Sequence, residues 1–86
     1  MNETEIIQRT EALPDRFAGR LPPDTLESLR LMEAGGEYGE LLIELAAALA
    51  KYGVPVTARE RDELRDLLAA SGMPVEAVGR LIVADG

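Results

Sequence analysis

Residues 24–50, DTLESLRLMEAGGEYGELLIELAAALA, contain the clearest helical pattern of the chain. Their second half predicts a helix over residues 37–52, because its apolar side chains repeat with a period of about 3.6 residues. These side chains fall on one arc of that helix: Tyr38, Leu41, Leu42, Leu45, Leu49 and Tyr52. Gly35-Gly36 permits the left-handed backbone that ends many helices, so a preceding helix is expected to stop there.

Further helices are expected on both sides of this run. They cover Glu3–Ala12, Pro23–Ala34, residues 57–70 and a short segment that begins at Pro74. Asn2 is a candidate cap for the first helix, and Pro14 forces a kink or a restart soon after it. Thr57 and Glu60 have the spacing of a capping box. The segment after Pro74 is expected to bury four apolar side chains: Val75, Val78, Leu81 and Ile82.

These patterns predict an all-α fold, a compact bundle of four to five short helices that forms a single domain over residues 1–86. β-Branched residues are few and scattered, so strands are not expected. Six leucines should be buried together in the core: Leu41, Leu45, Leu49, Leu64, Leu67 and Leu68.

The composition narrows the classes of function. The chain has no Cys, which rules out disulfides and thiolate metal sites, and no His, the commonest general base. A formal net charge of −7 disfavours binding to nucleic acid or to anionic membranes and favours a basic partner. The N-terminal residues lack the pattern of a secretory leader, so we expect a cytoplasmic protein. No cofactor is expected.

The acidic charge is concentrated in residues 24–50, where six carboxylates accompany one base, Arg30. Glu37, Glu40 and Glu44 share a flank of the predicted helix beside its apolar arc. Such a flank could hold an acid–base pair or a hard cation, but carboxylate sites in bundles also use His, which this chain lacks. A surface that faces a partner or serves only solubility explains the same residues, and we do not expect an enzyme.

Two other kinds of function are compatible with the pattern. Residues 64–82 resemble a helix-turn-helix with a turn at Gly72, which would make the protein a DNA-binding regulator. In the second helix of that motif, Arg80 would be the only cationic side chain able to contact bases or phosphates, and Glu76 lies in the same helix. Alternatively, the protein could be a homodimeric helical adaptor that associates through the leucine stripe of residues 37–52.

Residues 34–41, AGGEYGEL, and residues 52–57, YGVPVT, flank an alanine- and leucine-rich helix. This arrangement resembles the MafI-type small immunity proteins of bacterial polymorphic toxin systems, although Glu40-Leu41-Leu42 after Gly39 replaces the more usual small and apolar continuation. The resemblance covers about residues 22–82. It implies a cytoplasmic antitoxin that binds the C-terminal domain of one cognate toxin and covers its active site or substrate groove.

Many such toxins are nucleases or act on nucleotides, so their grooves are basic, and an acidic helical face would suit them. The expected partner-binding residues are Glu33, Glu37, Glu40 and Glu44, with Tyr38 at the edge. Tyr38 is either an aromatic anchor for the partner or a cap over the protein's own core.

Overall fold

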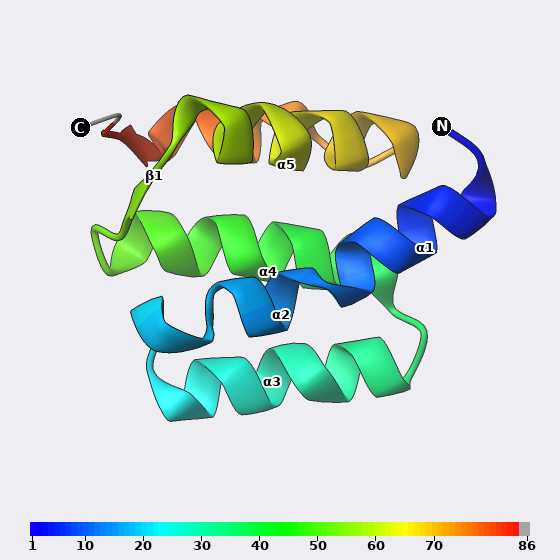
Figure 1. Ribbon diagram of the computed structural model, residues 1–86, viewed down its shortest axis with the longest axis horizontal. Coiled ribbons are helices and arrows are strands. Elements are labelled where there is room, and N and C mark those ends of the chain that lie inside the picture. Colours follow the sequence, from blue (N-terminus) through cyan, green and yellow to red (C-terminus); the bar gives the residue numbers. More distant parts are fainter. Residues whose placement is uncertain (85–86) are drawn as a thin grey trace.

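The chain folds as an all-α bundle around one central helix (Figure 1). The structure, a computed structural model, describes residues 1–84. Its elements are the helices α1 (Glu3–Glu11), α2 (Leu13–Arg16), η1 (Ala18–Arg20), α3 (Pro23–Ala34), α4 (Tyr38–Lys51), α5 (Ala58–Ala70) and η2 (Val75–Arg80), with strands β1 (Pro55–Val56) and β2 (Ile82–Val83). η1 and η2 are 3₁₀-helices. The fold class predicted from the sequence is confirmed.

α4 lies in the middle of the molecule, with α3 on one side and α5 on the other, and these three helices run in alternating directions (Figure 1). α1 also contacts α4, and η2 closes against both α4 and α5. The radius of gyration is 11.8 Å, close to the value of about 12 Å typical of one compact domain of this length. The central position of α4 explains why its sequence has the strongest helical pattern.

The core is formed where α4 and α5 face each other. The six leucines expected there are at most 1% exposed: Leu41, Leu45, Leu49, Leu64, Leu67 and Leu68. Leu13, the first residue of α2, and Phe17, the residue after α2, are also fully buried and belong to the same apolar cluster. The predicted core is therefore confirmed, and the segment around Pro14 adds the second set of large side chains.

The predicted helix boundaries follow from local hydrogen bonds. Asn2 Oδ1 accepts from the Glu5 amide at 2.8 Å at the start of α1. The α1 helix stops at Glu11, and the chain restarts at Leu13, as expected with proline at position 14. Thr57 Oγ1 accepts from the Glu60 amide at 3.0 Å, and Glu60 accepts from the Thr57 amide at 2.9 Å, which is a complete capping box.

Three expectations of burial are wrong. Tyr52 is 46% exposed, because α4 ends at Lys51 and the chain turns away through Gly53, whose φ is +62°. Val75 is 38% exposed at the first position of η2, where no preceding turn of helix covers it. Ile82 is 49% exposed, because η2 ends at Arg80 and Ile82 belongs to a strand instead.

That strand was not expected from the sequence. β2 pairs with β1 in parallel, with Pro55 opposite Ile82 and Val56 opposite Val83. The amide of Ala84 extends the pairing by donating to the Val56 carbonyl at 2.9 Å. Parallel strands need a crossover connection, which α5 and η2 supply here. The pair fastens the end of the described chain to the loop after α4.

Candidate functional site

The turn between α3 and α4 brings four of the five predicted partner-binding residues to one end of the bundle: Glu33, Glu37, Tyr38 and Glu40. Gly36 adopts a φ of +71°, a conformation that glycine takes without strain. The Gly36 amide donates to the Glu33 carbonyl at 3.0 Å, and the Glu37 amide donates to the Met32 carbonyl at 2.8 Å. This tight closure places the last turn of α3, with Glu33, beside the first turn of α4.

Tyr38 is the centre of this arrangement. Its hydroxyl donates to Glu11 Oε2 at 3.0 Å, which links the start of α4 to the end of α1. This hydrogen bond, partial burial of the ring and the charges of Glu11 and Glu33 all raise the pKa of Tyr38 above its ordinary value. Tyr38 is half-buried, and its hydroxyl lies beside the carboxylate of Glu11 and within the influence of the charge of Glu33.

We call Glu11, Glu33, Glu37 and Glu40 the acidic turn. Glu37 and Glu40 are exposed at the start of α4, while Glu33 is half-buried. Sequence reasoning missed Glu11, because it lies 27 residues before Tyr38 and only the tertiary fold brings the two together. No local pattern of the sequence distinguishes Glu11 from the other exposed acids.

Glu44 lies further along α4 and faces another neighbour. It lines a cavity of about 210 Å³ between α3 and α4, together with Asp24, Ser28 and Lys51. The structure therefore groups Glu33, Glu37 and Tyr38 closely and places Glu40 in the first turn of α4. Glu44 continues the same flank toward α3 rather than joining the acidic turn.

Ion pairs neutralise acidic side chains elsewhere in the molecule. The paired carboxylates within residues 1–84 are Glu5, Asp15, Glu60, Asp62 and Glu63, with Arg9, Arg30, Arg20, Arg61 and Arg16 respectively. None of Glu33, Glu37, Glu40 and Glu44 is in ion-pair contact with a cation of the described chain. The negative charge of these four side chains is therefore not offset by an ion pair within residues 1–84, and three of them, Glu37, Glu40 and Glu44, are exposed.

The structure also bears on metal binding, membrane insertion, the helix-turn-helix and the homodimer surface. In the described part of the chain, no three acidic side chains are grouped as metal ligands, and no helix has the length and apolarity needed to cross a bilayer. The second element of the helix-turn-helix candidate is η2, a six-residue 3₁₀-helix that leads directly into β2. The leucine stripe proposed for homodimerisation is buried within the monomer, so it is not available to a second copy.

Comparison of the chain with protein-family models, with curated proteins and with solved structures returns no match.

Proposed function

We propose that this protein is a non-enzymatic immunity protein that binds a basic toxin domain through the acidic turn and the adjoining Glu44. The observation that carries the proposal is that Glu33, Glu37, Glu40 and Glu44 have no ion-pair partner within residues 1–84, and the last three are exposed. Acidic side chains that form ion pairs within the molecule attract a basic partner only weakly. Carboxylates without an ion-pair partner keep their negative charge available to one.

The proposed mechanism is occlusion of a basic substrate groove. A negative surface accelerates encounter with a positive one, and carboxylates can occupy the positions of substrate phosphates. Tyr38 supplies a half-buried aromatic ring at the centre of the contact, and aromatic side chains are common among the residues that dominate binding energy. The resemblance to MafI-type immunity proteins, carried by residues 34–41 and 52–57, supports a toxin domain as the partner and the cytoplasm as the place of action.

Charge reversal tests this proposal. We expect Glu37→Lys, Glu40→Lys and Glu44→Lys, combined in one variant, to weaken binding to the toxin domain encoded beside this gene by at least about 2 kcal/mol. The fold should survive, because these side chains are exposed and lie off the core. Association should also slow steeply as salt rises, since exposed charges are screened beyond about 8 Å at physiological ionic strength.

The matched control reverses three other exposed acids that have no ion-pair partner in the described chain, Glu27, Asp66 and Glu76. It changes the net charge by the same amount, so it separates the position of the charge from its total. Asp62 and Glu63 are unsuitable controls, because their ion pairs with Arg61 and Arg16 would be lost. Equal losses in both variants, measured by stopped-flow binding, would contradict a contact at the acidic turn.

A further inference from the structure

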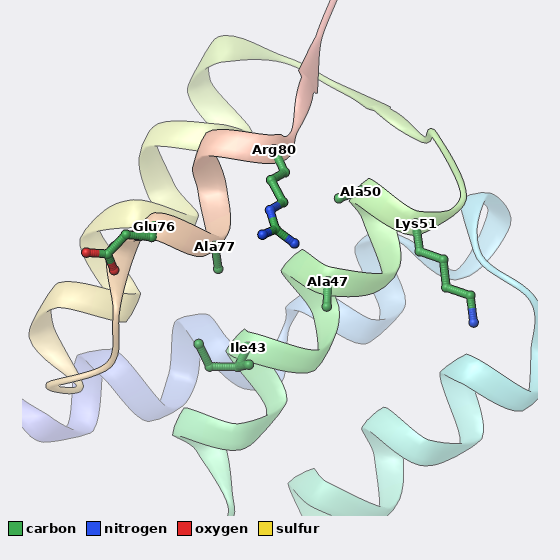
Figure 2. Close-up of a pocket in the computed structure, with 7 residues that line it drawn as sticks. All are labelled: Ile43, Ala47, Ala50, Lys51, Glu76, Ala77 and Arg80. Atoms are coloured by element: carbon green, nitrogen blue, oxygen red, sulfur yellow. The ribbon is translucent and has the colours of Figure 1, made fainter.

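A second surface lies on the neighbouring flank of α4. An open groove of about 520 Å³ runs between α4 and η2 (Figure 2). Its floor is apolar, with Ile43, Ala47 and Ala50 on α4 and Ala77 facing them from η2. Ala47 is exposed, and the other three side chains are only half-buried. A stripe of apolar side chains on the central helix thus remains accessible although its opposite face forms the core.

Arg80 gives this groove its charge. Its side chain reaches from the end of η2 over the alanine floor, whereas Glu76 points away from the groove (Figure 2). Lys51 also extends away, and its ammonium lies 5.3 Å from the centre of the Tyr52 ring. Within residues 1–84, Arg80 makes no ion pair, although five other arginines of this acidic chain do so: Arg9, Arg16, Arg20, Arg30 and Arg61.

We propose that the groove binds an amphipathic helical segment of a protein partner that carries a carboxylate opposite Arg80. The groove is bounded by two helices, and small side chains on its floor allow the backbone of a third helix to approach closely. A guanidinium offers parallel donors that match the two oxygens of a carboxylate. The charge of the groove is thus opposite to that of the acidic turn, and this second contact does not depend on the function proposed above.

The test uses a synthetic helical peptide of about 15 residues, with leucines at positions i, i+4 and i+7 and one glutamate beside them. Amide NMR spectra of the labelled full-length protein should shift at Ala47, Ala50 and Ala77 as the peptide is added. Replacing the peptide glutamate by glutamine should weaken binding about threefold to fivefold, as expected for a partly exposed ion pair.

Variants of the protein test whether the weaker binding of the glutamine peptide arises at Arg80 in the groove. Arg80→Gln should bind the glutamate and glutamine peptides equally, whereas Arg65→Gln should behave as the unchanged protein. Arg65 is the matched control, because it is exposed on α5, outside the groove, and makes no ion pair in the described chain. Ala47→Glu should abolish binding by placing a carboxylate inside the groove on a helix that tolerates it.

Three results would overturn the proposal. The first is a lack of shifts along the groove at about 1 mM peptide, the affinity range of a weak single-helix contact. The second is a preference for the glutamate peptide that persists in Arg80→Gln. The third is a concentration-dependent dimer, seen by sedimentation and lost in Arg80→Gln but not in Arg65→Gln, which would assign the groove to a second copy of the chain.

Discussion

Thr10 is a buried polar residue whose hydroxyl has no hydrogen-bond partner in the described structure. It lies in α1, where it is fully buried. A buried hydroxyl without a partner loses its hydration without compensation. We therefore expect Thr10→Val to raise the free energy of unfolding by about 1 kcal/mol, measured by urea denaturation.

Thr57→Val is the matched control for that measurement. The Thr57 hydroxyl accepts from the Glu60 amide at 3.0 Å and caps α5, so the same substitution should lower stability by about 1 kcal/mol there. Opposite signs at the two threonines would show that the hydrogen bond, rather than the shape of the side chain, decides the outcome. A loss of stability in Thr10→Val would mean that the hydroxyl has a partner in solution.

Leu45 tests how much a single core residue contributes to stability. It is fully buried on α4 between the neighbouring helices, and Leu45→Ala should cost about 2–4 kcal/mol of unfolding free energy. Leu31→Ala, at a position that is 66% exposed on α3, should change stability by less than about 0.5 kcal/mol. A loss below about 0.5 kcal/mol at Leu45 would show that α4 does not form the core.

Single residues also mark the limit of sequence reasoning. Gly35-Gly36 predicted the turn before α4, but the sequence did not reveal why the residue after Tyr38 is glycine. A Cβ at position 39 would lie 3.0 Å from Met73 Sδ, so the glycine allows the loop after α5 to contact the start of α4. The contact joins positions far apart in the chain, as does the bond from Tyr38 to Glu11, and no local pattern encodes either one.

At the scale of elements, the sequence was most informative where a helix end depends on its own side chains. Asn2, the capping box of Thr57 and Glu60, and the left-handed Gly36 were all predictable, because each acts within a few residues. β1 and β2 were not, because each strand has only two residues and forms through a partner on the far side of α5 and η2. Short strands carry too few residues for an alternating pattern.

Glu60 connects two elements and makes their contact pH-dependent. Arg20 donates to both oxygens of its carboxylate, at 3.1 and 2.7 Å, which fastens η1 to α5. The hydrogen bond to Arg20 is the main cause that lowers the pKa of Glu60 below its ordinary value of 4.5. Since the folded state has the lower pKa, this contribution to stability is present above pH 4.5 and is lost as the pH falls through the depressed value.

Glu60→Gln should isolate the charge, because glutamine can still accept from the Thr57 amide in a capping box. We expect a loss of about 1 kcal/mol at neutral pH, and this difference from the unchanged protein should shrink below pH 4.5. Urea unfolding of both proteins across this pH range measures the difference. A loss that is independent of pH would contradict the role assigned to the ion pair with Arg20.

At the scale of the whole molecule, net charge and the length of η2 bear on the DNA-binding alternative. The chain carries a net charge of −7, and the second element of the helix-turn-helix candidate is a six-residue 3₁₀-helix with one arginine. A recognition helix must enter the major groove and contact phosphates on both sides, which requires more length and more positive charge than η2 offers. Both features, the short η2 and the negative net charge, disfavour binding to DNA.

We expect no binding to random duplex DNA tighter than about 10⁻⁴ M at low salt, measured by fluorescence anisotropy. Low salt is the demanding condition, because nonspecific binding to DNA strengthens as salt falls. The variant with lysine at positions 37, 40 and 44 is an informative comparison, since it changes the net charge from −7 to −1 while leaving residues 64–82 intact. Micromolar, salt-sensitive binding by the unchanged protein would favour the DNA-binding alternative, whereas binding by the variant alone would show that the acidic flank of α4 repels phosphate.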